Sequence, residues 1–348
     1  MKLRILSELD ARNCLDVTGA IEAQEEAFAL LAAKQAIEGL RSFVPSESPP
    51  AVTIFNPCYL KNGRGFGIKV VSDFLRNDDV VIPRMSALVV LFCGETGLPR
   101  TVMEGGFLTD LRTGAGTALA ARHLARPESA SLLLFGAGRV ARNQLAALAE
   151  VLPLARVRII TRSRERAEQF VHWTQRAGGR IPDDVAVASS ATAAIAEADV
   201  VVCATTATQP VLSGAVLRPG TFVAAAGANR VDAREVDSET IRRAGKRVID
   251  SRADCLEYAG DLQIPLSERI IRESDVAEIA ELIAGRRPGR ESPEEITYYK
   301  SIGVPIQDLW TAQRIEARAI AAGIGTVIEI GGDPIPLEPR HGCSSGTR

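Results

Sequence analysis

The sequence predicts an α/β fold in which a doubly wound parallel sheet fills the second half of the chain and an α+β part precedes it. From residue 129 onward, short apolar runs alternate with helical segments, the pattern of a parallel sheet covered by helices on both faces. Before residue 127, strand-like segments are joined by a short glycine-containing turn, which indicates an antiparallel sheet. The length of 348 residues fits two domains of ordinary size.

The first part is predicted to contain a long helix, four strands and a second helix. Apolar residues recur at helical spacing over residues 10–36. Pro45, Pro49 and Pro50 are then expected to break the chain. The expected strands are residues 51–55, 67–71, 86–92 and 99–103, with a turn at 93–97 and a helix at 108–124.

The second part is predicted to alternate strands and helices as far as about Thr297. A further helix over residues 301–323 needs a surface for its apolar face, so we expect it to cross back to the first part. The last dozen residues, with Pro339 and Gly342, should form a loose terminus. The expected strands are Ser131–Phe135, 157–160, 185–188, 200–204, 222–226 and 247–249, with helices at Arg139–Val151 and Arg164–Ala177.

Composition and charge indicate a globular protein of the cytoplasm without nucleic-acid or membrane partners. Hydrophobic residues make up 46% of the chain, which is enough for a hydrophobic core. The net charge is −2, so the composition does not indicate a basic surface for nucleic acid or anionic lipid. No apolar run approaches the ~20 residues needed to span a bilayer, and Glu8, Asp10 and Arg12 exclude a secretory signal. Six scattered cysteines without a CxxC pair, and three histidines, predict neither disulfides nor a metal site.

A nucleotide-binding turn is predicted at Gly136–Ala141, where a strand ends and a helix begins. Gly136 permits the tight turn, Gly138 lets the backbone approach a pyrophosphate, and Ala141 takes the place of a third glycine in close helix–strand packing. The N-terminus of the helix offers free N–H groups to the phosphates. The second part is therefore expected to be a Rossmann domain.

The end of the second strand favours NADP(H), with NAD(H) as the other possibility. An NAD enzyme usually has an acid there for the ribose hydroxyls. This chain has two arginines and two hydroxyls at 161–164, which suit a 2′-phosphate, although Ser163 would also serve as a helix cap. The expected cofactor contacts are Thr113, Gly136, Gly138, Arg139, Val140, Thr161, Arg162, Ser163, Arg164, Thr205 and Thr206.

Two cations lie in apolar or glycine-rich surroundings where a side-chain charge needs a partner. They are Lys69, within Gly65–Val71, and Arg112, within Leu111–Thr117. A buried cation must reach water or find an anion, and the carboxylate of a substrate would serve.

At these positions the chain resembles the ornithine cyclodeaminase/mu-crystallin family, over nearly its whole length. The family implies a homodimer in which a substrate-binding and dimerisation domain, residues 1–126 and 300–348, encloses an inserted Rossmann domain, residues 127–299. The matching segments are Gly67-Ile68-Lys69-Val70, the turn region 91–103, residues 102–115, Gly136-Ala137-Gly138, Gly289-Arg290-Glu291-Ser292 and residues 301–308.

The resemblance also implies site residues. The family's contacts to the substrate carboxylate fall on Arg41, Lys69 and Arg112, and arginine grips a carboxylate with two hydrogen bonds. Lys69 would bond the nitrogen side of the substrate or its carboxylate. Neighbouring cations should lower its pKa, which would suit proton donation.

Asn229 departs from the cyclodeaminase pattern. Cyclodeaminases of the family carry an aspartate at this position, and an amide cannot act as a general base. The segment 227–235 is more similar to the ketimine reductase branch of mu-crystallin, so Asn229 joins Arg41, Lys69 and Arg112 as a candidate catalytic residue. The expected activity is NADPH-dependent reduction of an α-imino acid to an α-amino acid. The substrate would be cyclic, such as pyrroline-2-carboxylate or piperideine-2-carboxylate, or linear.

Two other functions stay open at this point. One is ornithine cyclodeamination to proline and ammonia, with Asp232 or Glu235 replacing the missing aspartate. The other is a weakly catalytic protein that holds NADPH and a ligand, as mu-crystallin does. Release of ammonia from ornithine would identify the first, and a kinetic assay would separate the second from a reductase.

Overall fold

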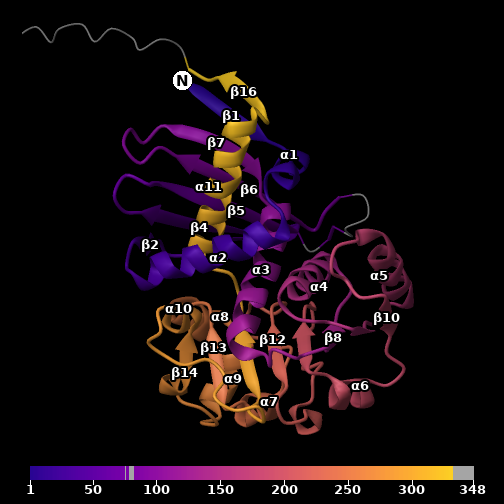
Figure 1. Cartoon of the computed structure of the whole chain (residues 1–348). Coiled ribbons are helices and arrows are strands. Elements are labelled where there is room, and N and C mark those ends of the chain that lie inside the picture. The colour runs from indigo at the N-terminus through magenta and orange to yellow at the C-terminus, as the bar shows by residue number, and fades with distance from the viewer. Residues whose placement is uncertain (75, 78–81, 332–348) are drawn as a thin grey trace, which may run out of the picture.

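The computed structural model of the chain describes residues 1–74, 76–77 and 82–331. It contains two eight-stranded sheets with helices between and around them (Figure 1). The second sheet is parallel throughout, which confirms the predicted α/β class. The expected loose terminus with Pro339 and Gly342 lies outside the described residues.

The first sheet runs in the order β16-β1-β7-β6-β5-β4-β2, and β3 pairs with β4. Of these pairings, β1 with β7 is parallel and the rest are antiparallel. The strands are β1 (Lys2–Leu6), β2 (Ala36–Glu38), β3 (Ser42–Glu47), β4 (Pro50–Leu60), β5 (Gly65–Phe74), β6 (Met85–Phe92), β7 (Pro99–Glu104) and β16 (Thr326–Glu329).

The second sheet has the order β10-β9-β8-β11-β12-β15-β13-β14. The strand order runs outward from β8 to β9 and β10 on one side and from β11 to β12 on the other, so it reverses between β8 and β11. Ligands of such sheets bind at the carboxyl ends of the strands beside that point. The strands are β8 (Ser131–Phe135), β9 (Arg156–Ile160), β10 (Asp184–Val187), β11 (Val200–Cys203), β12 (Phe222–Ala225), β13 (Lys246–Ile249), β14 (Val276–Glu278) and β15 (Thr297–Lys300).

Helices α2, α3 and α4 lie where the two sheets meet (Figure 1), and α11 packs against α2 and β5. None of the helices in the described ranges is long and apolar enough to cross a membrane. The helices are α1 (Glu8–Cys14), α2 (Val17–Ala32), α3 (Gly106–Leu124), α4 (Arg139–Val151), α5 (Arg164–Ala177), α6 (Ala191–Glu197), α7 (Ser238–Arg243), α8 (Arg252–Tyr258), α9 (Gly260–Ser267), α10 (Ile279–Ile283) and α11 (Pro305–Ala322), with short 3₁₀ turns at Gly214–Val216 and Glu273–Asp275.

The predicted helix over residues 10–36 is wrong as a single element. It is two helices, because Leu15 is extended and Asp16 caps a new start by accepting a hydrogen bond from the Gly19 N–H at 2.8 Å. Its last residue, Ala36, belongs to strand β2. The apolar periodicity continues through the break, and only the cap marks it.

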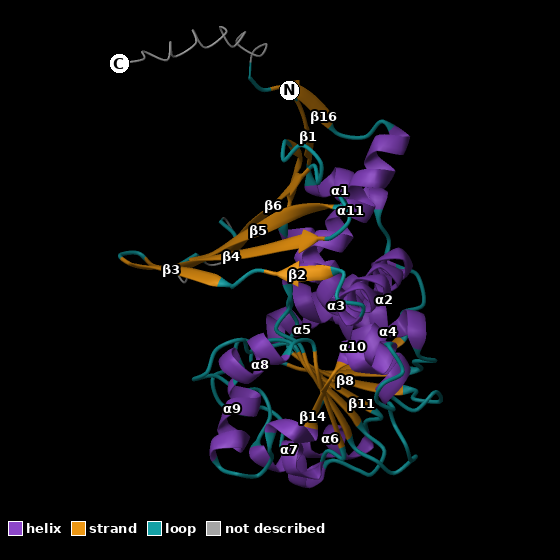
Figure 2. Ribbon diagram, turned by 90° about the vertical axis from the view of Figure 1, so that its left-hand side faces the viewer, coloured by secondary structure: helices purple, strands orange, loops and turns teal. Residues whose placement is uncertain are grey.

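Of the three prolines that were expected to break the chain, Pro49 lies in the turn between β3 and β4 and Pro50 begins β4, but Pro45 interrupts no element. Pro45 lies inside β3, which forms a hairpin with β4 and projects from the body of the molecule (Figure 2). All six residues of β3 are exposed, and β3 pairs with β4 alone among the described strands. An edge strand tolerates proline because one of its sides needs no partner.

The helix predicted over 301–323 begins at Pro305 and ends at Ala322, with Gly323 in the left-handed conformation as its cap. It packs on the first sheet and α2, as expected. Residues 301–304 form a non-helical crossover between β15 and α11. The division at 126/127 and 299/300 stays a prediction; strand membership supports it closely, with Lys300 still part of the second sheet.

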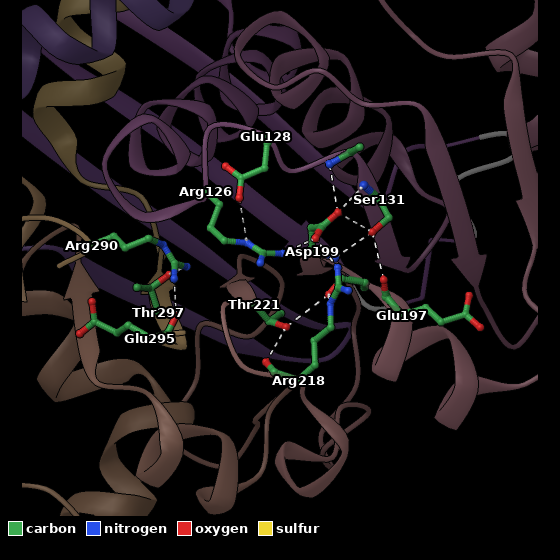
Figure 3. Close-up of polar contacts among 12 residues, drawn as sticks. Arg126, Glu128, Ser131, Glu197, Asp199, Arg218, Thr221, Arg290, Glu295 and Thr297 are labelled. Carbon is green, nitrogen blue, oxygen red and sulfur yellow. Dashed lines mark hydrogen bonds and ion pairs between the residues drawn. The ribbon is translucent and has the colours of Figure 1, made fainter. Parts of the chain in front are cut away.

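The other crossing, from α3 to β8, is tied to the second sheet by Asp199. Its carboxylate accepts hydrogen bonds from the Ser131 N–H at 2.9 Å and the Ser131 hydroxyl at 2.8 Å, and from the guanidinium groups of Arg126 and Arg218 (Figure 3). Arg290 donates to the Leu124 carbonyl at 2.8 Å and to Thr297 at 3.0 Å. These contacts lie at the amino ends of the parallel strands, away from the expected ligand site, and fix the path of the chain between the sheets.

Candidate functional site

Two of the predicted cations meet at one carboxylate. Asp308, in the first turn of α11, lies 2.6 Å from the Lys69 ammonium and 2.9 Å from Nε of Arg112. All three side chains are buried. Alternation along β5 points Lys69 to the helix side with Gly67 and Val71, and α3 brings Arg112 to the same place.

The terminal nitrogens of Arg112 are not bonded to any residue that the structure describes, since only Nε is taken by Asp308. Arg41 lies beside this group: its guanidinium donates to the Gly303 carbonyl, and its Nε is 3.8 Å from Asp254 on α8. The three cations that were predicted from separate segments are thus gathered at the crossover between the two sheets, with guanidinium N–H groups left over to bind an anion.

Burial sets the charge states of this cluster. Burial lowers the pKa of Lys69 to about 7, and Arg112 pushes in the same direction while Asp308 opposes both. Burial also disfavours the Asp308 carboxylate, but Arg112 and Lys69 outweigh it and lower the pKa of Asp308 below its ordinary value. Lys69 is therefore poised to give or take a proton near neutral pH, next to a carboxylate that stays ionised.

Three polar residues of the site were not predicted. Asp308 occurs in a quoted motif, but a first-turn acid is common in any helix. Glu38 accepts from the Ile306 N–H at 3.0 Å, and burial raises the pKa of its carboxyl to about 7. Asn56 lies opposite Lys69 in the β4–β5 register, buried, and its Oδ1 has no hydrogen-bond partner in the described part of the chain.

The turn after β8 has the geometry expected of a pyrophosphate cradle. Gly136 has φ +105°, and a Cβ there would overlap the Ala204 carbonyl, so glycine is required. Gly138 faces open space, and no side chain caps α4. The free N–H groups of the first turn, which includes Val140, can therefore reach a phosphate. The side chain of Arg139 pairs with Asp110 at 2.7 Å.

The turn after β9 presents cationic side chains to solvent. Ser163 caps α5 by accepting from the Arg166 N–H at 3.2 Å, and the Thr161 hydroxyl accepts from the Ser163 N–H at 3.4 Å. Arg164 pairs with Glu168 on the exposed side of α5. Arg162 is exposed, and no hydrogen bond or ion pair joins it to another residue within the described ranges.

The remaining predicted residues are Thr113, Thr205, Thr206 and Asn229, and they lie outside the two turns described above. Thr113 is buried, and its hydroxyl donates to the Thr109 carbonyl at 2.6 Å. Thr205 follows β11 and donates to Glu235 at 2.8 Å, while Thr206 is exposed. Asn229 is exposed in the loop after β12, and among the described residues no hydrogen bond links it to Arg41, Lys69 or Arg112. Its role as a catalytic residue stays a prediction.

The acids near Asn229 are both occupied. Glu235 is fully buried and accepts from the N–H groups of Thr205 and Gly227 at 2.7 Å each and of Ala228 at 3.1 Å. Asp232 is exposed and paired with Arg230 at 2.9 Å. Glu235 therefore joins the loops after β11 and β12, and neither acid points a free carboxylate at the cation cluster. No group of three His, Cys, Asp or Glu side chains in the described residues could hold a metal ion.

Comparison with known proteins agrees with this arrangement. The profile of the ornithine cyclodeaminase/mu-crystallin family matches residues 2–323, so the chain belongs to that family. A Δ1-pyrroline-2-carboxylate reductase of Bacillus cereus is 32% identical over 326 residues, which are 93% of this chain and 99% of that protein.

Two solved structures share the whole fold. A Δ1-pyrroline-2-carboxylate reductase of Thermococcus litoralis, in complex with NADH and L-proline, has a TM-score of 0.88 at 35% identity and covers 93% of this chain and 99% of its own. An archaeal alanine dehydrogenase dimer with bound NAD also has a TM-score of 0.88, at 31% identity, and covers 95% of this chain and 100% of its own. The family resemblance noted in the sequence is thereby confirmed.

Proposed function

We propose that the chain reduces the C=N bond of a small α-imino acid with NADPH, giving the α-amino acid, and that cyclic imines such as Δ1-pyrroline-2-carboxylate or piperideine-2-carboxylate are its substrates. A bound nicotinamide nucleotide supplies a hydride to the imine carbon. A proton adds to the nitrogen, so that the C=N π bond is replaced by one C–H and one N–H bond. The chain is thus an oxidoreductase acting on C=N bonds.

The observation that carries the proposal is the cation cluster around Asp308. The unbonded guanidinium nitrogens of Arg112 and Arg41 suit a substrate carboxylate held by two arginines. Lys69, with its pKa lowered to about 7, suits the donor that protonates the imine nitrogen. A carboxylate and a basic nitrogen attached to the same carbon, as in an α-imino acid, match this pair of functions.

The cofactor preference rests on Arg162. It is exposed at the end of β9, free of partners in the described chain, and no acid occurs at residues 160–164. An arginine in this place binds a 2′-phosphate through charge-assisted hydrogen bonds, whereas the ribose hydroxyls of NADH give it no anion. The Thermococcus relative holds NADH. We expect this chain to differ from it in preferring NADPH, and the Kd values of the two nucleotides measure that preference.

The arrangement near Asn229 favours reduction over cyclodeamination. Glu235 is saturated by N–H donors, Asp232 is paired with Arg230, and Asn229 has no titrating group. We therefore expect purified protein incubated with ornithine and NAD to release no ammonia. Clear release of ammonia together with proline would contradict the reductase proposal and identify the chain as a cyclodeaminase.

The test is oxidation of NADPH, followed by absorbance, with Δ1-pyrroline-2-carboxylate, piperideine-2-carboxylate, and pyruvate plus ammonia as parallel substrates. The proposal expects turnover with a cyclic imine and formation of the matching cyclic amino acid. Binding of NADPH without turnover of any of the three would support the ligand-holding alternative instead.

A further inference from the structure

The crossover of residues 301–304 lies between the nucleotide half of the molecule and the cation cluster. It leaves the second sheet at the end of β15 and enters α11 at Pro305, three residues before Asp308. Its conformation therefore decides how Asp308 and the two arginines approach one another.

A buried carboxylate of the second sheet holds this crossover. Asp250, at the end of β13, is fully buried. Its Oδ2 accepts from the N–H groups of Ile302 at 2.9 Å and Gly303 at 2.7 Å, and from the Ser301 hydroxyl at 3.1 Å. Three donors from consecutive residues bind one carboxylate oxygen, and they fix the backbone conformation of the crossover.

Gly303 is the point at which the crossover touches both arginines. Its carbonyl accepts from the Arg41 guanidinium. Its φ is +77°, and a Cβ built there would overlap the terminal nitrogens of Arg112. These are the nitrogens that Asp308 leaves unbonded, since it binds Nε alone. The bare backbone of Gly303 thus lies against the terminal nitrogens of Arg112, and its carbonyl holds Arg41.

We propose that Asp250 and Gly303 are positioning residues for the carboxylate of the substrate. Asp250 sets the path of the crossover, and the missing side chain of Gly303 lets the guanidinium groups of Arg112 and Arg41 face the same carboxylate. This inference rests on the proposed function, in which those two arginines bind that carboxylate. The second sheet, through Asp250, would thus set the geometry of the anion site, although neither arginine belongs to that sheet.

The test compares two glycines that differ in their neighbours and not in their backbone. Gly323, at the end of α11, has φ +67° with nothing within 4 Å of a Cβ. Gly303→Ala and Gly323→Ala therefore carry a similar left-handed strain, but only Gly303→Ala displaces Arg112. Four quantities are measured for each variant: the melting temperature, the Kd of NADPH by fluorescence, the Kd of furan-2-carboxylate in the presence of NADP⁺ by calorimetry, and the KM for the imino acid. Furan-2-carboxylate is a cyclic carboxylate without a reducible C=N bond.

The proposal expects Gly303→Ala to weaken furan-2-carboxylate binding and raise the KM for the imino acid by about tenfold or more, as for a lost charge-assisted contact. Its NADPH affinity should match that of Gly323→Ala, which should bind the carboxylate like the unaltered protein. Equal carboxylate affinities in the two variants would overturn the proposal, as would a protein that binds no furan-2-carboxylate at all.

Asp250→Asn provides the second arm, because it keeps the shape of the side chain. It should weaken carboxylate binding in the same direction while NADPH affinity is unchanged. Unaltered carboxylate binding in this variant would contradict the role of Asp250. If the unaltered protein binds furan-2-carboxylate and loses it on Gly303→Ala, yet reduces no imine, the positioning role stands while the proposed activity fails.

Discussion

Asp308 determines how two cations of the candidate site are held. It fixes Arg112 through Nε and Lys69 through its ammonium group, and it is the nearest anion that keeps the Lys69 proton in place. A lysine that is buried without such a carboxylate would lose its proton at a lower pH. The acidity of Lys69 is therefore a property of the pair, and it can be moved by changing either member.

Imine reduction should follow the protonation of Lys69. Its pKa is lowered to about 7, so the ammonium form is present below that pH and is lost as the pH rises through it. We expect kcat/KM for a cyclic imine to fall with pH around neutrality. Asp308→Asn removes a carboxylate that raises the pKa of Lys69, so the fall should begin at a lower pH. Lys69→Met serves as the control, since it should lack this step; a midpoint unchanged by Asp308→Asn would refute the pairing.

Arg162→Asp should reverse the cofactor preference. The substitution removes a charge-assisted bond to the 2′-phosphate, worth about 1.5–3 kcal/mol, and adds an acid that suits the ribose hydroxyls of NADH. The Kd of NADPH should rise roughly tenfold or more, while that of NADH stays equal or falls. Arg176→Asp, in the last turn of α5, the helix that follows Arg162, is the matched control for net charge. Equal affinities of the unaltered protein for the two nucleotides would contradict the assignment.

Some residues of the candidate site could be predicted from the sequence, and others could not. Lys69 and Arg112 could be singled out because charges in apolar or glycine-rich segments need a partner. Gly136 and Gly138 could be singled out because a strand precedes them and a helix follows. Asp308 could not, because its partners lie on other elements, Arg112 being 196 residues away in the chain. Its local pattern is that of any acid in a first helical turn.

At the scale of elements, the two loops next to the nucleotide turn are held by one buried side chain. Glu235 accepts from the loop after β11 and the loop after β12. Nearby, Asp261 accepts from the Glu235 N–H at 2.7 Å and pairs with Lys300 at 2.7 Å, and both members of that pair are fully buried. The ends of β11, β12 and β15 are thereby joined through polar groups with no access to solvent.

Glu235→Gln should destabilise the protein by about 3 kcal/mol or more. The amide keeps the shape of the side chain, but its NH₂ group faces backbone N–H donors, and buried donors are left without an acceptor. Asp232→Asn, three residues earlier at an exposed ion pair, should change the free energy of unfolding by no more than about 0.5 kcal/mol. Denaturant unfolding of both variants makes the comparison. Equal stabilities would show that the loops are held by other contacts.

Elements were predictable where a clear apolar run or face marks them, and most of the missed strands are short ones that lie at or near a sheet edge. Ser131–Phe135, Arg139–Val151 and Arg164–Ala177 have the predicted bounds, because a buried run or a single apolar face sets their limits. β1, β2, β3, β14, β15 and β16 were missed. All but β15 lie at or near sheet edges, and they form because another strand is available to pair with them. β15 is a buried central strand of four residues that lies between β12 and β13, and its short sequence did not mark it.

At the scale of the whole molecule, the first sheet is covered unequally. Its helices lie on one side (Figure 2). On the other side, register pairs place Val70 beside Leu88, Ile68 beside Val90, and Phe66 beside Phe92. The rings of Phe66 and Phe92 are stacked, with their centroids 4.6 Å apart. These residues are half-buried or exposed, and an apolar patch of this kind marks an interface. We propose that it pairs with a second copy of the chain.

Leu88→Glu should therefore produce a monomer. Leu88 is 53% exposed in the single chain, so a charge there leaves the fold intact but must be desolvated in a dimer. Leu98→Glu is the control, because Leu98 is 50% exposed in the turn after β6 and belongs to none of the three register pairs. Light scattering after size-exclusion chromatography measures both masses. A Leu88→Glu protein with the same mass as the Leu98→Glu control would exclude this face as the interface.

The order in which the ribosome delivers the strands has a consequence for biosynthesis. Strands β4 to β7 emerge early, but α11, which packs on their helix side, is made only after β15 has completed the second sheet. Chain segments fold as units when their own sequence is available, so the nucleotide half can mature while Val89 and Leu91 still await their cover. The nascent chain would then acquire its phosphate cradle first. Lys69 and Arg112 would meet only when Asp308 arrives, after the second sheet is complete.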